Sequence, residues 1–474
     1  MTLIASLKAL PIGRIAVVHA AVLGLFLAWR FGGMEPGARW IAAWLCLPAP
    51  GLLALALLTR RTEPARAAWV LAPLALLCVQ VGASLLNPSR QSYQFWDTEV
   101  LRAAPHIGWL PSTPLPTATA TDFLLNAGLV LTGLNLMFCH PPRAWLRGLL
   151  WLIAGNGMVL AVVGTIFRLQ GAELILGRQP SPNPNFFATF VYHNHWGAYA
   201  ILAAGAALGL LLHTERRTAP RPLTRTHVPL LALVAAVILC TIPLSSARAS
   251  TVAAAVLAGG AGLLIAGRLA RRLRRSGPGD NLRRAGLVAT VLIVGLFGLL
   301  QGSASWRREF DQTREQITDL RTGGIGDARL VIYRDTWELI RARPVFGWGW
   351  QSFQYVYPGV QSEIPRMHAR TGRQAVLDAH NDWLQLLAET GLWGCTCLGA
   401  ALWGCWRWGK GRLRSPPQSV LLLTLGALGL LALVDFPFAC PAIMLTAATL
   451  LAIGAETARG TSEDLPAESA RRSN

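Results

Sequence analysis

Twelve apolar stretches, each close to the length that crosses a lipid bilayer, are the feature that most restricts what this chain can fold into. A membrane-spanning helix needs about 20 mostly apolar residues. With 53% hydrophobic and 14% charged residues, the chain of 474 residues is too apolar for a soluble protein of its size. The sequence therefore predicts an all-α polytopic membrane protein with about 12 transmembrane helices. The expected spans lie near 15–33, 40–58, 67–86, 122–139, 144–167, 194–213, 228–246, 250–267, 285–301, 383–404, 418–436 and 438–456.

Basic residues gather in alternate loops between these stretches. They are Lys8, Arg14, Arg60, Arg61, Arg66, Arg143, Arg147, Arg216, Arg217, Arg221, Arg225, the arginines of 268–284, Arg407, Lys410, Arg412 and Arg414. Short cytoplasmic loops retain positive charge, so this face is predicted to be cytoplasmic, together with both termini. The net charge of +19 then reflects topology and attraction to anionic lipid headgroups, and no nucleic-acid binding is expected.

The opposite face receives three longer segments, 87–121, 168–193 and 302–382. Eleven arginines in 302–382 are nearly matched by ten acids, which favours a folded loop. Arg329, Tyr333, Trp337 and Arg341 recur every four residues before Pro344, as in an amphipathic helix lying on the membrane. Residues 87–121 are rich in proline and aromatics and are predicted to be an ordered surface loop without regular structure.

The chain is thus expected to have three parts. Residues 1–170 form N-terminal transmembrane helices with the loop 87–121. Residues 171–456 form a transmembrane core that includes the large outer loop 302–382. Residues 457–474 form a polar cytoplasmic tail.

The most informative site candidates stand where the large loop returns to the membrane. His380 is followed by Asn381, Gln385 and Glu389, which are four residues apart and form a polar stripe on an otherwise apolar helix. Polar groups at membrane depth are costly and usually functional, so Asn381, Gln385 and Glu389 are candidate substrate-binding residues. Asn381 and Asp382 can orient the imidazole or cap the helix. The structural alternative is that His380 merely caps the helix.

Three arginines on the same face are suited to bind phosphate. Arg248 lies in a tight turn among small residues at a helix start, where backbone donors add to its charge. Arg329 and Arg334 open the helix of the large loop, where an arginine fork can grip two phosphate oxygens. A snorkelling arginine at 248, and internal salt bridges of Arg329 or Arg334 to Asp335 and Glu338, are the structural alternatives.

His193, Asn194 and His195 open the sixth span on the same face. Two histidines at i and i+2 can suggest a metal, but no carboxylate cluster accompanies them in sequence. Hydrogen bonding to sugar or phosphate is therefore favoured, and no metal or cofactor is expected.

The order of these motifs resembles that of the O-antigen ligase and polymerase family. The resemblance runs from about Tyr192 to Gly394: a His-Asn helix start, a Ser-x-x-Arg turn, an Arg-x-x-x-Tyr-Arg helix, Pro-Val-Phe-Gly-Trp-Gly, and His-Asn-x-x-Leu-Gln. Asp435-Phe-Pro-Phe adds a further likeness.

The resemblance implies metal-independent, inverting glycan transfer from a polyprenyl (undecaprenyl) diphosphate in the bacterial inner membrane, with a periplasmic active site. By motif position, Arg248 and Arg329 would bind the diphosphate and His380 would lie at the reacting centre. His380 would act as a general base or as a phosphate ligand, and both remain open. Arg334, His193, Asn194 and His195 are further, weaker candidates for substrate binding.

The acceptor stays open between lipid A-core, as in O-antigen ligation for lipopolysaccharide biosynthesis, a growing polysaccharide and a protein. A transporter of an anion or a lipid-linked sugar is the alternative from another class. Transporters place ionisable groups near the midplane on repeated, broken helices. Here these groups lie at the outer surface and no repeat is evident, which favours an enzyme. The chain has no Walker-type nucleotide motif, so the donor is expected to carry its own leaving group.

Overall fold

The computed structural model describes residues 9–59, 62, 64–96, 98–177, 179–181, 183, 185–214, 227–273, 328–362, 376–409 and 415–459. The helices within these ranges are α2 (Ile12–Trp29), α3 (Pro36–Leu45), α4 (Pro48–Leu58), α5 (Pro64–Leu86), α6 (Pro116–Phe138), α7 (Arg143–Leu169), α8 (His193–Thr214), α9 (His227–Leu244), α10 (Arg248–Leu273), α12 (Ala328–Ala342), α13 (Phe353–Val356), α15 (Asp382–Trp408), α16 (Pro416–Leu431) and α17 (Pro441–Arg459). Short 3₁₀ turns lie at Phe31–Gly33, Tyr357–Gly359 and Pro437–Ala439.

The predicted all-α membrane fold is confirmed. Nine helical segments of the described chain are long and apolar enough to cross a membrane, with α3 and α4 acting together as one. The predicted spans 383–404 and 418–436 correspond to α15, which begins with polar residues, and to α16, which has only 16 residues. The predicted span 285–301 lies outside the described residues.

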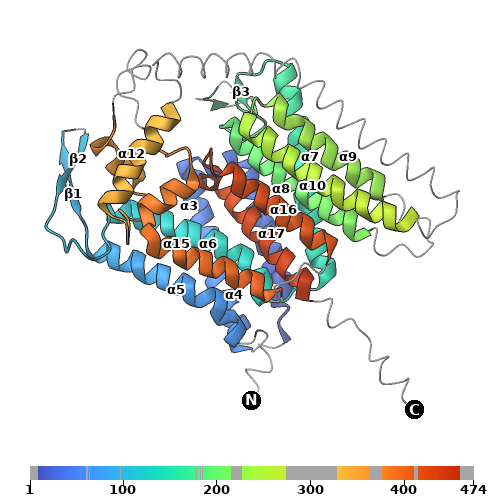
Figure 1. Cartoon of the computed structure of the whole chain (residues 1–474), viewed down its shortest axis with the longest axis horizontal. Coiled ribbons are helices and arrows are strands. Elements are labelled where there is room, and N and C mark those ends of the chain that lie inside the picture. The colour runs from blue at the N-terminus through green and yellow to red at the C-terminus, as the bar shows by residue number, and fades with distance from the viewer. Residues whose placement is uncertain are drawn as a thin grey trace.

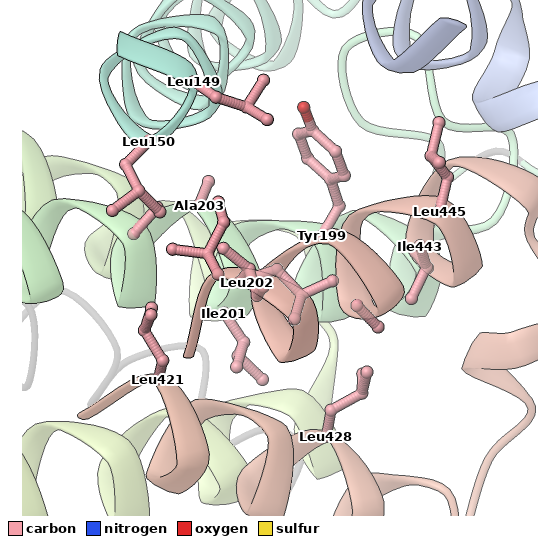
Figure 2. Packing of buried hydrophobic residues seen from close by; sticks show 14 of the residues in the cluster. Leu149, Leu150, Tyr199, Ile201, Leu202, Ala203, Leu421, Leu428, Ile443 and Leu445 are labelled. Carbon is pink, nitrogen blue, oxygen red and sulfur yellow. The ribbon is translucent and has the colours of Figure 1, made fainter. Parts of the chain in front are cut away.

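Helix α8 forms the centre of the bundle. Residues 194–212 of this helix are all buried, and α7, α9, α10, α16 and α17 pack around it (Figure 1). Leucines of α7 and α16 and residues of α17 converge on Ile201, Leu202 and Ala203 (Figure 2). Gly205 leaves no room for a Cβ because Thr424 of α16 fills that space. Small residues that permit such close approach are typical of helix packing in membranes.

Contacts between residues distant in sequence show which described segments lie at the same end of the helical bundle. At one end, Glu456 of α17 accepts hydrogen bonds from Trp408 and pairs with His140, which also lies next to Thr62. At the other end, Arg90 donates to the Tyr355 carbonyl. Residues 62, 140, 408 and 456 therefore lie together at one end, and residues 90 and 355 lie together at the other.

The prediction that 87–121 has no regular structure is wrong. Strands β1 (Arg90–Phe95) and β2 (Thr98–Ala103) form an antiparallel hairpin, seen at the edge of the molecule in Figure 1. The prolines of the segment lie outside both strands, so they do not remove hydrogen bonds from the ladder. A second, two-residue pair, β3 (Leu174–Ile175) and β4 (Gln179–Pro180), lies in the predicted segment 168–193.

The large loop is hydrogen-bonded to the backbone of helix α15 at a break in that helix, at Gly391. There the backbone leaves the helical conformation (φ 64°, ψ −171°). The turn after α12 supplies the missing partners: Leu392 N donates to Pro344 O at 2.9 Å, and Gly349 N donates to Glu389 O at 2.8 Å. Gln80 of α5 donates to the Thr390 carbonyl at 2.9 Å. Broken helices are tolerated at membrane depth where protein satisfies the freed backbone groups, as it does here.

Replacing Gly391 with alanine is expected to lower the unfolding temperature in detergent. The conformation at this position is accessible essentially only to glycine, and forcing another residue into it costs about 1–3 kcal/mol. A Cβ would also collide with the Val345 carbonyl. Gly399→Ala is the matched control, because open space surrounds Gly399 in the same helix. Equal unfolding temperatures for the two variants would contradict the conclusion that position 391 requires glycine.

Candidate functional site

Phe436, in the turn between α16 and α17, joins the histidines of two distant segments. Its ring meets that of His380 at 4.9 Å and that of His195 at 5.3 Å, both edge to face, and stacks on Tyr192 at 5.1 Å. His195 Nε2 also lies 3.3 Å from the Phe436 carbonyl. Residues 192–195 and 380, about 185 positions apart in sequence, thus share one aromatic centre.

His380 is held in place by its backbone. It adopts a left-handed conformation (φ 53°), which is uncommon outside glycine and often marks functional sites. The Tyr333 hydroxyl of α12 donates to its carbonyl at 2.8 Å. The loop helix therefore determines where the imidazole stands.

Arg329, in the first turn of α12, lies beside the same centre. Its guanidinium contacts the Tyr192 hydroxyl and interacts with His193 and Asp435. Burial raises the pKa of Tyr192 to about 12. Arg168, at the end of α7, adds a second positive charge near His193. The arrangement presents cationic groups, a phenol and imidazoles to one place, which suits binding of an oxyanion.

Asn381, Gln385 and Glu389 support this centre. The Asn381 side chain accepts from Leu384 N at 3.0 Å and so caps α15. Gln385 accepts from Ala379 N at 2.9 Å and donates to Glu389 at 3.1 Å. Glu389 in turn accepts from the backbone of Gln351 and Phe353. The predicted polar stripe therefore binds the returning loop to α15.

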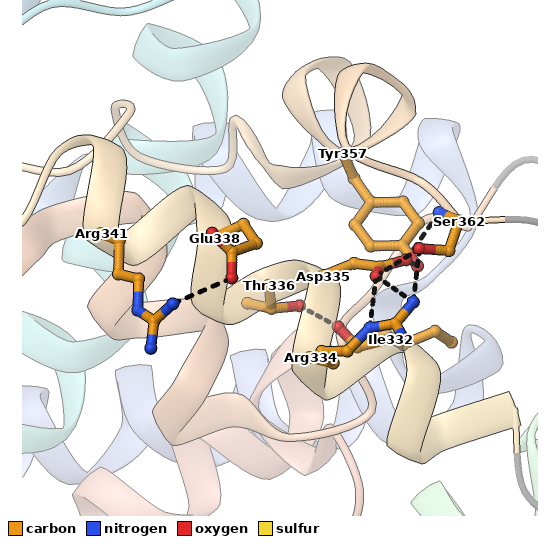
Figure 3. Close-up of polar contacts among 8 residues, drawn as sticks. All are labelled: Ile332, Arg334, Asp335, Thr336, Glu338, Arg341, Tyr357 and Ser362. Atoms are coloured by element: carbon orange, nitrogen blue, oxygen red, sulfur yellow. Dashed lines mark hydrogen bonds and ion pairs between the residues drawn. The ribbon is translucent and has the colours of Figure 1, made fainter.

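Arg334 lies in a different environment from Arg329. Its side chain is 67% exposed, donates to Ser362 Oγ at 2.6 Å and pairs with Asp335 at 3.4 Å (Figure 3). The buried Asp335 also accepts from Tyr357 and from Ser362 N. This network ties α12 to the segment after α13.

Arg248 is exposed in the first turn of α10. The turn before it packs on the start of α8, where Gly197 lies so close to Ser250 and Ala247 that no Cβ would fit. Arg248 therefore stands at the end of the bundle that carries His193–His195.

Two carboxyl groups at the centre, Asp378 and Asp435, were not among the predicted site residues. Burial raises the pKa of each to about 6, and hydrogen bonds partly oppose the shift. Nearby Arg39 and Arg329 lower the pKa of Asp378 and Asp435, respectively. Asp435 lay within a predicted apolar span, and an acid in such a span is the signal that could have identified it. Among the described residues, no group of three or more His, Cys, Asp or Glu is arranged to hold a metal.

Asp435→Asn is expected to stabilise the protein at pH 8 and to leave it unchanged at pH 4. The pKa of this buried acid rises in the folded state from 3.8 to about 6, so its favourable contribution exists below pH 4 and is lost as pH rises through about 6. Asparagine mimics the protonated form and would retain up to about 3 kcal/mol at pH 8. Chemical unfolding across this pH range measures the difference. Equal stabilisation at both pH values would contradict the shift.

The fold and this cluster define a multi-pass membrane protein with a polar, cationic site at one end of its helical bundle. Residues 231–399 match the family model described as O-antigen ligase, and the chain therefore carries a domain of the O-antigen ligase family, which confirms the predicted resemblance. This match supports glycan transfer of the O-antigen ligase or polymerase type in general. No curated protein matches the chain significantly.

The matched region contains Arg248, Arg329, Arg334, His380, Asn381, Gln385 and Glu389. His193–His195 and Asp435 lie outside it, and the fold brings them to the same centre.

Proposed function

We propose that this protein transfers a glycan from undecaprenyl diphosphate, or a related polyprenyl carrier, to an acceptor hydroxyl at the outer face of the bacterial inner membrane. Its acceptor is lipid A-core, so the reaction is O-antigen ligation in lipopolysaccharide biosynthesis. The observation that carries this proposal is the meeting of Arg329 with Tyr192 and His193, next to His380, around Phe436.

In the proposed reaction, the acceptor oxygen attacks the anomeric carbon as the bond to the diphosphate oxygen breaks. The electron pair of that bond leaves with the diphosphate, and Arg329 and Arg248 stabilise the growing negative charge. His380 takes the proton of the attacking hydroxyl, a role suited to an imidazole near neutral pH. A single direct displacement inverts the anomeric centre.

Support for the arrangement comes from the charge balance. Arg329 and Arg168 both lie near His193, and burial makes the ionised form of Asp435 beside Arg329 less favourable than it is in water. An incoming diphosphate would add negative charge next to these two arginines. Asn194 donates to the Tyr192 hydroxyl at 3.0 Å. In this arrangement, His193 and Asn194 would hydrogen-bond to a sugar or phosphate oxygen of the donor.

The decisive experiment is transfer by purified protein in lipid nanodiscs, with a synthetic undecaprenyl-diphosphate glycan, lipid A-core and a chelator. Glycosylated lipid A-core is the expected product. Elongated donor in place of this product would identify a polymerase, and a glycosylated peptide an oligosaccharyltransferase. Absence of product with every acceptor, while the folded protein still binds donor, would refute the proposal.

The site is proposed to face the periplasm, with both termini in the cytoplasm. In a cysteine-free background, single cysteines replacing Leu330 or Arg248 should react with an impermeant maleimide from outside. Cysteines replacing Arg274 or Arg412, which lie outside the described residues, should react only after the membrane is opened. The reverse pattern would invert the topology.

A further inference from the structure

A second group of basic side chains lies at the other end of the loop helix α12. Arg343, half-buried just beyond that helix, donates to Ser112 Oγ and, at 2.9 Å, to His106 Nε2. Its guanidinium lies 4.3 Å from the centre of the Trp348 ring. Three of its contacts are therefore neutral, and none supplies a negative charge.

Arg90 stands next to this group. The backbone N–H of the preceding residue, Ser89, donates to the Thr113 carbonyl at 2.8 Å, and Arg343 donates to the Ser112 hydroxyl. Arg343 and the residue that precedes Arg90 thus contact two consecutive residues, Ser112 and Thr113. Arg90 itself donates to the Tyr355 carbonyl at 2.8 Å. Burial lowers the pKa of Arg343, and the charge of Arg90 lowers it further.

Neither arginine takes part in an ion pair with a described carboxylate. By contrast, two arginines of α12 are paired: Arg341 with Glu338 and Arg334 with Asp335. Two like charges in a partly desolvated place raise the free energy of the folded state unless an anion joins them. Arginine forks match the planar oxygens of phosphate.

The distance along α12 separates this group from the proposed reaction centre. Arg329 and Arg343 are 14 residues apart, which corresponds to about 21 Å of helix. One diphosphate cannot span that length. The surroundings also differ, because Ile107, Trp109 and Val345 next to the group are apolar and 50%, 77% and 52% exposed. Exposed aromatics beside arginines are typical of the level of lipid headgroups.

We infer that Arg90 and Arg343, with Ser112, form a second oxyanion site, which takes a phosphate group carried by a membrane lipid or free in solution. The bound phosphate would lie between the two guanidinium groups and neutralise them. It would also fasten the β1–β2 hairpin to the turn that enters the break in α15.

The test measures binding of three probes to the purified full chain in detergent: inorganic phosphate, dioctanoyl phosphatidic acid and dioctanoylglycerol. An Arg329→Ala background removes the contribution of the reaction centre. Arg90→Gln and Arg343→Gln should each weaken binding of a phosphate probe by about 10-fold or more. Arg341→Gln, an exposed arginine of α12, is the matched control and should leave affinity unchanged.

Hydrogen exchange identifies the site independently, because phosphate should slow exchange in 104–113 and 343–356. Tighter binding of phosphatidic acid than of phosphate would assign the site to a lipid headgroup, and equal affinities would assign it to free phosphate. Equal phosphate affinity in the parent and both glutamine variants, or equal binding of the uncharged dioctanoylglycerol, would overturn the inference. Arg90→Gln keeps the test valid if the Arg343 variant misfolds, because Arg90 donates to a single backbone carbonyl, that of Tyr355, and its loss should disturb the fold less.

Discussion

Replacing Arg329 with alanine is expected to reduce glycan transfer by about 10²–10³-fold, the usual cost of removing one group that stabilises charge in a transition state. Arg329 is the cation that contacts Tyr192 and interacts with His193, and the growing charge on the leaving diphosphate would lie beside it. Arg329→Lys should restore part of the rate, because a lysine keeps the charge but not the planar fork.

Initial rates with a synthetic donor, measured with the same protein in nanodiscs, check this result. Arg341→Ala is the matched control: it removes an arginine from the same helix whose side chain is 64% exposed and pairs with Glu338. Transfer at the parental rate by a folded Arg329→Ala protein would remove this residue from diphosphate binding. Arg248→Ala tests the second arginine in the same assay.

His380→Ala is expected to lower turnover by about 10²–10⁴-fold, the range of general acid–base groups, while donor binding is largely kept. The carbonyl of residue 380 would still accept from Tyr333, and the Asn381 cap would still close α15, so the fold should survive. His380→Gln is a useful second variant, since it can hydrogen-bond but cannot take up a proton at neutral pH.

Three roles of His380 give three different results. If His380 is a general base, its replacement with alanine lowers turnover and removes the acidic limb of the pH–rate profile. If it is a phosphate ligand, the replacement weakens donor binding, and glutamine restores part of the affinity. If its role is purely structural, the replacement lowers the unfolding temperature without a specific loss of rate. Unchanged transfer by the well-folded alanine variant would exclude His380 from the mechanism.

The fold could be predicted largely from the apolar stretches, because each span satisfies its own backbone and its length is set by the bilayer. The hairpin 90–103 could not, since β1 and β2 alternate weakly and prolines surround them. The break at Gly391 was equally hidden. In sequence, a glycine in a regular apolar helix cannot be told from one at a break, where, as here, Leu392 and Trp393 donate to the carbonyls of Pro344 and Val345.

The site was predictable where a residue type is unusual for its position. His380, Arg329 and His193–His195 are polar groups at the mouth of apolar spans. Phe436, which their rings surround, is an aromatic residue in an apolar stretch and resembles any packing residue. The roles of Gln385 and Glu389 depend on which loop returns to them. Their partners are backbone amides of residues 351, 353 and 379, which no local pattern reveals.

The break in α15 also decides how this molecule can be recombined with relatives. Because Pro344, Val345, Trp348 and Gly349 complete the hydrogen bonding of that helix, residues 328–360 cannot be grafted as a separate loop. A chimera that exchanges the loop alone would leave backbone N–H and C=O groups of the recipient protein's helix without hydrogen-bond partners. One that exchanges the loop together with α15, and with a glutamine at the place of Gln80, would transfer an intact unit. Specificity carried by the loop should therefore be inherited only along with its helix.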